Sequence, residues 1–272
     1  MFIVKLGGSL ITYKQDIGNP SYRWNETKLR YRVKEDNIRK AAMAIREHIG
    51  SDLIIVHGGG THGHRTVKRW REGISKGPTG MMAWEVKWRM LDLTKKVIGV
   101  LGRYGIPAVE VAPSDIIVMD GSDIHRMDVQ PMQRILERGG VPTLRGDLAS
   151  DIDGSWSVIS GDDIIVELCH SMLKKDIEKV VMCMEEEGVY HRFGMDEQRL
   201  IGTFKGNTDI GSAGPFSENR DETGGITGKI SACRKIAEHG VTSQIIGGDI
   251  GVTLRKALSG EQVGTIFPGE EQ

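Results

Sequence analysis

The sequence opens with MFIVKLGGS (residues 1–9), a short apolar run that ends in a lysine, two glycines and a serine. The run is rich in apolar and β-branched residues, so we expect a buried strand over residues 1–5. Glycine has no Cβ and adopts positive φ readily, which lets the backbone N–H groups after the strand approach an anion closely. The stretch therefore predicts a strand followed by a phosphate-binding turn.

A second stretch, LIIVHGGGTHGH (residues 53–64), repeats this pattern. We expect a strand over residues 53–56 and another glycine turn after it. The three histidines of this stretch are candidate zinc ligands, but neither a cysteine nor a clear carboxylate joins them. In a structural alternative, His57 braces the glycine turn and His62 faces solvent.

The rest of the chain alternates predicted strands and helices, the pattern of a mostly parallel sheet that helices cover on both faces. Its 272 residues suit one large α/β domain or two intimate lobes. A polar, glycine-rich stretch at 192–221 predicts a mobile segment or a β-ribbon, and Asp120-Gly121 predicts a hairpin turn. The predicted helices are 25–49, 81–104, 128–138, 160–170 and 227–239, and the further strands are 107–111, 141–144, 157–159, 180–184, 243–247 and 263–267.

Composition excludes several classes of protein. The formal net charge is -1, so no global electrostatic attraction to nucleic acid or to an anionic membrane is expected. Cys169, Cys183 and Cys233 lack CxxC spacing, which argues against a disulfide framework and a zinc ribbon and favours a reducing cytoplasm. The chain shows no secretory signal pattern, and no apolar stretch approaches the ~20 residues that span a bilayer.

Two familiar nucleotide motifs fit the sequence poorly. A Walker P-loop requires GxxxxGK[ST], and TGGITGKI at residues 223–230 lacks its first glycine and its final hydroxyl. Gly58, Gly60 and Gly63 match the dinucleotide pattern GxGxxG, but the acidic residue expected about 20 positions later would be Glu85, which lies in a helix-like sequence. A nicotinamide oxidoreductase is therefore disfavoured.

Both glycine turns are accounted for by one resemblance. KLGGS with Thr12 and Lys14 resembles the opening of the amino acid kinase superfamily. Within it, HGGG followed by Gly63-His64, then SGDD at 160–163, then TGG at 223–225 with Lys229, resembles the isopentenyl phosphate kinases. The motifs keep the family's order from Lys5 to about Phe267.

The resemblance implies an amino acid kinase-like three-layer αβα sandwich with a central, mostly parallel sheet. It implies a single domain over residues 1–272, with a phosphate-acceptor lobe at about 1–175 and a nucleotide lobe at about 176–268. It also implies ATP as the phosphoryl donor, Mg²⁺ supplied with ATP, no side-chain metal ligands, a homodimer and a cytoplasmic location. The implied reaction is phosphorylation of isopentenyl phosphate to isopentenyl diphosphate.

The resemblance also implies roles for individual residues. Lysines would neutralise the transferred phosphoryl group, glycine N–H groups would hold phosphates, and a histidine would donate a hydrogen bond to the acceptor's phosphate. Asp162 would orient the lysines, although it could also N-cap the helix that follows it. The implied catalytic residues are Lys5, Lys14, His64 and Asp162; the implied nucleotide contacts are Lys5, Gly7, Gly8, Ser9, Gly60, Glu185, Gly225 and Lys229; the implied acceptor contacts are Gly59, Gly60, His64 and Gly161.

The sequence departs from the family pattern at two places. His62 stands where relatives usually carry an aromatic hydrocarbon, and the segment MEEEGVY (residues 184–190) replaces a pattern that usually reads Thr-Asp-Val-Asp-Gly. A fosfomycin-type phosphonate kinase stays open as an alternative, because such kinases share a glycine turn that ends in Gly-His and residues 84–89 are charged and aromatic. A non-catalytic nucleotide sensor on the same scaffold is the alternative from another class.

Overall fold

A computed structural model describes the protein at residues 1–13, 31–48, 50, 52–73, 79–171, 177–206, 208, 210 and 225–270. Lys14 lies outside these residues, as do Thr223 and Gly224 of the predicted nucleotide loop and most of the stretch predicted to be mobile or a ribbon after residue 206. The twelve remaining candidate site residues are placed by the structure.

A seven-stranded sheet forms the centre of the molecule, in the order β13-β12-β9-β1-β2-β6-β3. The sheet is parallel except at one edge, where β13 pairs antiparallel with β12. The strands are β1 (Phe2–Leu6), β2 (Leu53–His57), β3 (Ala108–Glu110), β6 (Val141–Arg145), β9 (Lys179–Cys183), β12 (Ser243–Ile246) and β13 (Thr265–Phe267).

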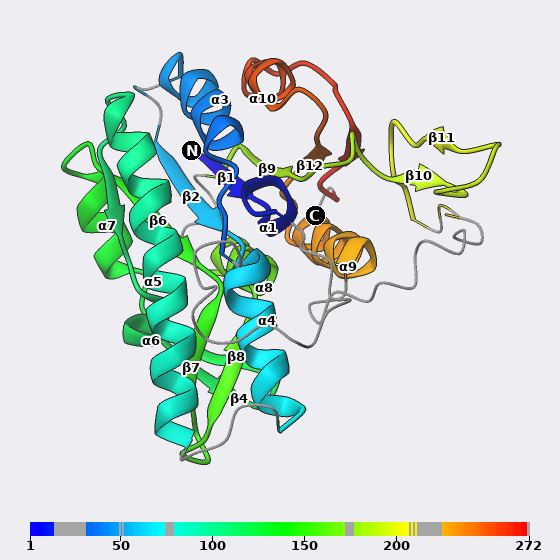
Figure 1. The fold of residues 1–272 in the computed structure, drawn as a ribbon. Coiled ribbons are helices and arrows are strands. Elements are labelled where there is room, and N and C mark those ends of the chain that lie inside the picture. The colour runs from blue at the N-terminus through cyan, green and yellow to red at the C-terminus, as the bar shows by residue number, and fades with distance from the viewer. Residues whose placement is uncertain are drawn as a thin grey trace.

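Helices cover both faces of this sheet, as its apolar strands require (Figure 1). Side chains alternate between the faces: Val4 and Ile55 belong to one buried cluster, and Ile3 and Ile54 belong to the other. The first cluster packs against α3 (Glu35–Arg46), α5 (Thr79–Arg103) and α10 (Ile250–Leu258), and the second against α8 (Gly161–His170) and α9 (Gly225–Glu238). The predicted αβα sandwich with a mostly parallel sheet is confirmed.

A second sheet of four strands, in the order β5-β4-β7-β8, stands beside the first. The predicted hairpin at Asp120-Gly121 joins β4 (Ile117–Asp120) to β5 (Asp123–Met127), which pair antiparallel. The ribbon of β10 (Tyr190–His191) and β11 (Arg199–Leu200) projects away from the central sheet (Figure 1). The remaining elements are α1 (Gly8–Ile11), α4 (Gly60–Arg71), α6 (Pro113–Ile116), α7 (Gln130–Leu136), β7 (Asp147–Asp151) and β8 (Trp156–Ile159).

One predicted helix is wrong in extent. The helix expected over 25–49 begins at Glu35 in the described residues and ends at Arg46. Val33, which the helical spacing included, forms an isolated antiparallel bridge with Thr12 instead. The bridge holds the chain extended before α3 and places Lys34 at its N-cap.

The predicted elements do not include α1, α4, α6, β7 and α10. The sequence of α4 contains mostly polar residues and two glycines, and only His62, Thr66 and Val67 of it are buried. Its apolar face is too narrow to give a helical period that stands out in the sequence. No helix of the described residues is long and apolar enough to cross a membrane.

Candidate active site

The two predicted glycine turns contact each other through bare backbone. A Cβ on Gly8 would lie 2.5 Å from the Gly60 nitrogen, and a Cβ on Gly58 would lie 2.6 Å from the Gly8 nitrogen. Gly60 also has a φ of +47°, which side chains rarely adopt. Glycine is therefore required for β1 and β2 to bring their carboxyl-terminal turns together.

This junction presents backbone N–H groups that the described residues do not satisfy. Among those residues, the N–H groups of Gly8, Ser9, Gly59 and Gly60 donate no hydrogen bond to a backbone or side-chain acceptor. Thr12 fixes the junction, since its hydroxyl donates to the Gly8 carbonyl at 2.8 Å and accepts from the Thr61 N–H at 3.3 Å. Donors held without an acceptor suit an anion.

Two lysines meet one aspartate beside these turns. Lys5 extends from β1 toward the α8–α9 layer, and its Nζ lies 2.5 Å from Asp162 Oδ1. Lys229, one turn into α9, places its Nζ 3.7 Å from Asp162 Oδ2. Two ammonium groups thus face one carboxylate, and the side chains of Lys5 and Asp162 are almost fully buried.

Burial and mutual charge shift the pKa values of this cluster. Burial lowers the pKa of Lys5, and the nearby Lys229 lowers it further, against the opposing pull of Asp162. Burial opposes ionisation of Asp162, but Lys5 and Lys229 outweigh it and hold the pKa of that carboxyl below its usual value. The carboxylate is therefore ionised at neutral pH, and the cluster carries an excess of positive charge that an anion would balance.

Asp162 is available for the lysines because other residues cap its helix. The Ser160 hydroxyl accepts from the Asp163 N–H at 3.1 Å, and the Asp163 carboxylate accepts from the Ser160 hydroxyl at 2.6 Å. Gly161 lies close to β2 and to Lys5, since a Cβ there would lie 3.1 Å from Val56 Cγ1 and 3.4 Å from Lys5 Cε. The capping alternative for Asp162 is thus filled by Ser160 and Asp163.

Glu185 does not join the Lys5 cluster. It follows β9, and its Oε1 accepts from Lys34 Nζ at 2.9 Å. Lys34 Nζ also donates to the Ser9 carbonyl at 3.0 Å, so it lies directly against the first glycine turn. Lys34 was not predicted as a site residue, because no motif contains it and its partner is 151 positions away in the sequence.

The three histidines occupy different environments. His57 braces its turn, with Nδ1 3.2 Å from the Gly58 carbonyl and Nε2 3.0 Å from the Thr94 hydroxyl. Burial lowers the pKa of His57 to about 3, so it is neutral. The solvent-facing position expected for His62 is wrong: the ring is fully buried and burial lowers its pKa to about 4. His64 lies one turn after Gly60 in α4.

The carboxyl end of β6 carries a second buried ionic cluster. Arg145 forms ion pairs with Glu110 at the end of β3 and with Asp147 at the start of β7, the latter at 2.9 Å. Burial raises the pKa of Asp147 despite the adjacent guanidinium. The Gly146 N–H donates to the His57 carbonyl at 3.1 Å, which ties this cluster to the end of β2.

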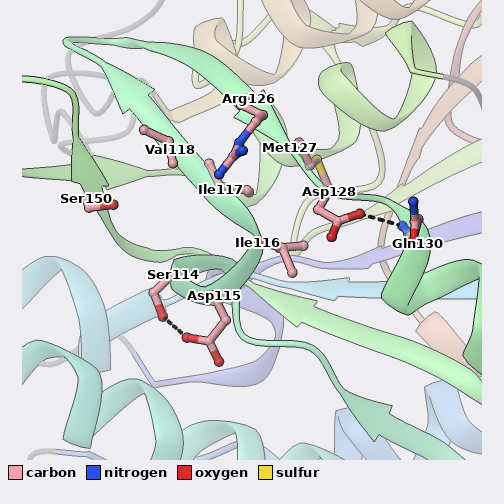
Figure 2. Close-up of a pocket in the computed structure, with 10 residues that line it drawn as sticks. All are labelled: Ser114, Asp115, Ile116, Ile117, Val118, Arg126, Met127, Asp128, Gln130 and Ser150. Carbon is pink, nitrogen blue, oxygen red and sulfur yellow. Dashed lines mark hydrogen bonds between the residues drawn. The ribbon is translucent and has the colours of Figure 1, made fainter.

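A cavity of about 390 Å³ lies against the four-stranded sheet (Figure 2). Its polar lining is partly paired within itself, since the Ser114 hydroxyl donates to Asp115 and the Gln130 N–H donates to Asp128. Among the described residues that line it, none is a predicted site residue. We therefore assign the candidate site to the glycine turns and their lysines. Among the described residues, no group of three or more histidine, cysteine, aspartate or glutamate side chains could hold a metal ion.

The chain is similar to known proteins over nearly its whole length. The family model described as amino acid kinase family matches residues 1–247. The chain belongs to the amino acid kinase family. Within this family, it is 33% identical over 99% of its length to the whole isopentenyl phosphate kinase of Methanothermobacter thermautotrophicus. It is 30% identical over 97% of its length to the isopentenyl phosphate kinase of Methanocaldococcus jannaschii, of which it covers 96%.

Solved structures place this amino acid kinase chain beside the same relatives. An X-ray structure of isopentenyl phosphate kinase superposes with a TM-score of 0.78 at 28% identity, covering 98% of this chain and 99% of the other. The resemblance read from the ordered motifs is confirmed.

Proposed function

We propose that this protein transfers the γ-phosphoryl group of ATP to isopentenyl phosphate and releases ADP and isopentenyl diphosphate. The observation that carries the proposal is the junction of the two glycine turns beside the Lys5, Asp162 and Lys229 cluster. The full-length relatives named isopentenyl phosphate kinase support the acceptor. These names do not favour the phosphonate-kinase alternative.

The first turn and the lysines serve the donor in this proposal. Phosphoryl transfer spreads negative charge over the moving group and both flanking oxygens, so catalysis rests on positioning and charge stabilisation. The N–H groups of Gly8 and Ser9 would hold the donor's β- and γ-phosphates, whereas the Gly7 N–H, also expected to do so, donates to the Cys183 carbonyl at 2.9 Å. Lys5 would neutralise the moving group. Asp162 would keep the ammonium groups of Lys5 and Lys229 in place. Lys14, outside the described residues, stays a proposed second lysine for the γ-phosphate.

The second turn serves the acceptor. The bond from the γ-phosphorus to the β–γ bridging oxygen breaks, and a bond to an oxygen of the acceptor's phosphate forms. A phosphate monoester is already anionic near neutral pH, so the reaction needs no strong general base. The N–H groups of Gly59 and Gly60 would bind it beside Gly161, and His64 would donate a hydrogen bond to it.

Mg²⁺ is proposed to arrive with the nucleotide. Asp162 is already paired with two lysines, and Glu185 is paired with Lys34. Mg²⁺ commonly binds through substrate phosphates and keeps several waters, which fits a site rich in cations and N–H donors. When bound, the ion would neutralise charge on the donor's phosphates. Gly225 at the start of α9 and Lys229 one turn later are the proposed contacts from the nucleotide lobe.

The deciding experiment is turnover of the purified protein with Mg-ATP and a panel of acceptors: isopentenyl phosphate, other alkyl phosphates, fosfomycin, UMP, glutamate and aspartate. Fast conversion of isopentenyl phosphate alone supports the proposal. Conversion of another acceptor with isopentenyl phosphate inert would refute the substrate and keep the kinase. Binding of ATP without any transfer would establish a nucleotide sensor.

We also propose that the protein is a cytoplasmic homodimer that associates through its acceptor lobe, about residues 1–175. Trp84 and Trp88 of α5 support this, since they are 56% and 55% exposed and stack with ring centroids 6.3 Å apart. Large exposed aromatic groups mark protein interfaces. Light scattering on the purified protein and on Trp88→Glu tests the assembly: the wild type should have twice the mass of the variant. Fractionation of cells tests the location.

A further inference from the structure

Lys34 reaches the first glycine turn from the side of the sheet opposite to Lys5. Lys5 and Lys229 approach from the α8–α9 layer, whereas Lys34 stands at the N-cap of α3, in the other layer. Its backbone N–H donates to the Ile11 carbonyl at 2.8 Å, which anchors it at the end of α1. The turn therefore has ammonium groups on both sides.

The contacts of the Lys34 ammonium group place it against the first glycine turn. Nζ lies 3.0 Å from the Ser9 carbonyl, in the turn whose Gly8 and Ser9 N–H groups have no acceptor among the described residues. The ring of Tyr13 lies under it at 5.6 Å. Only 15% of the side chain is exposed, so Lys34 is directed into the turn rather than into solvent.

The partner that Lys34 holds is replaceable. Glu185 is half-exposed, with 48% of its side chain accessible, and its ion pair joins the end of β9 to the end of α1. An ion pair with one exposed member contributes little to stability, since solvent screens it and its side chain loses freedom. A phosphate group offers Lys34 more charge and more acceptor oxygens than one carboxylate does.

We propose that Lys34 binds the terminal phosphates of the nucleotide, and that Glu185 holds this lysine in position until the nucleotide displaces it. The inference rests on the proposed function, because it assigns the first turn to the donor. The family resemblance implies that Glu185 contacts the nucleotide directly. In this proposal, the Glu185 carboxylate instead competes with the nucleotide's phosphates for Lys34.

ATP affinity without acceptor, measured by calorimetry, tests the inference together with steady-state kinetics. We expect Lys34→Met to weaken ATP binding at least ~10-fold and to raise KM for ATP alike, with KM for isopentenyl phosphate within about twofold of wild type. Lys34→Arg should restore most of the affinity. Lys40→Met is the matched control, since Lys40 lies on the same helix and its ion-pair partners among the described residues are the exposed Asp36 and Asp249. This variant should leave both constants unchanged.

Glu185→Gln separates the competing carboxylate from a nucleotide contact. We expect it to tighten ATP binding about two- to fivefold in low salt, and to have no effect when Lys34 is already Met, because it acts only through that lysine. Weaker ATP binding in Glu185→Gln, or unchanged ATP affinity in Lys34→Met, would overturn the inference. So would an equal loss for both substrates together with a lower melting temperature in Lys34→Met. Wild-type turnover tests the proposed function independently of all these variants.

Discussion

Two buried ionic clusters end strands of the same sheet, and their charge balance is opposite. At the end of β1, two lysines face the single carboxylate of Asp162, whereas at the end of β6 the single guanidinium of Arg145 lies between Glu110 and Asp147. Buried charge without a partner is costly. The Arg145 cluster is balanced within the protein, because Glu110 is partly exposed to solvent and burial raises the pKa of Asp147. Under the proposed function, an anion would balance the Lys5 cluster. We therefore expect the Arg145 cluster to stabilise the fold and the Lys5 cluster to bind a ligand.

The largest expected effect comes from breaking the Arg145 cluster. Arg145→Met leaves the buried Asp147 without a cation, so we expect unfolding free energy to fall by about 3–5 kcal/mol. Urea unfolding measures this. Arg103→Met is the control, since that side chain is 66% exposed, and it should change stability by less than ~0.5 kcal/mol. A stable Arg145→Met with low turnover would show that the two clusters do not divide in this way.

Removing Lys5 should lower activity and leave stability unchanged, the reverse of the effect expected for Arg145→Met. Lys5→Met takes away a preorganised charge at the moving phosphoryl group, so we expect kcat to fall about 10²–10³-fold. The remaining Lys229 still pairs with Asp162, and a buried ammonium group is lost, so the melting temperature should not drop. Turnover within about fivefold of wild type would exclude Lys5 from the chemistry.

Asp162 and Asp147, one buried aspartate from each cluster, allow the two clusters to be compared with the same substitution. Asp162→Asn removes the group that orients both lysines, so we expect about a 10-fold fall in kcat/KM for ATP. Asp147→Asn keeps the shape of a buried carboxyl whose pKa is already raised by burial, and turnover should stay within about twofold. Steady-state kinetics on both variants test this prediction. Equal losses of activity in the two variants would contradict a catalytic role for one cluster and a structural role for the other.

The smallest expected effect is a shift in the pH at which kcat/KM falls on the alkaline side. Lys5 must be protonated to neutralise phosphate, and its pKa lies below the ordinary value of 10.5 because of burial. We expect kcat/KM to fall as pH rises through that lowered pKa, hence below pH 10.5. Asp162 raises the pKa of Lys5, so Asp162→Asn should move this fall to lower pH. Lys5→Arg, which stays charged, should lose it.

The sequence predicted the sheet and the two turns because their signals are local. Apolar runs ending in glycine are read within ten residues, and β1 and β2 begin and end within one or two residues of the predicted strands. The pairing of Lys5 with Asp162 followed from the family resemblance, and its geometry agrees with that implied arrangement. The roles of the site residues stay predictions until the variants are measured.

What the sequence did not predict depends on distant contacts. Lys34 meets Glu185 across 151 positions, and nothing in the residues around either one signals the other. His62 carries a polar ring in a polar helix, so local pattern places it outside, yet α4 turns it inward, where its ring lies 5.2 Å from that of Tyr31. Packing between elements decides such positions, and it overrides local polarity.

The backbone contact between Gly8, Gly58 and Gly60 limits how an enzyme of this kind can change. The two turns lie in backbone contact because these glycines have no Cβ, and an added methyl group would push the turns apart. Substitution of these glycines can therefore only increase the distance between the two turns. Under the proposed function, a change of acceptor would therefore have to come from residues outside these three glycines.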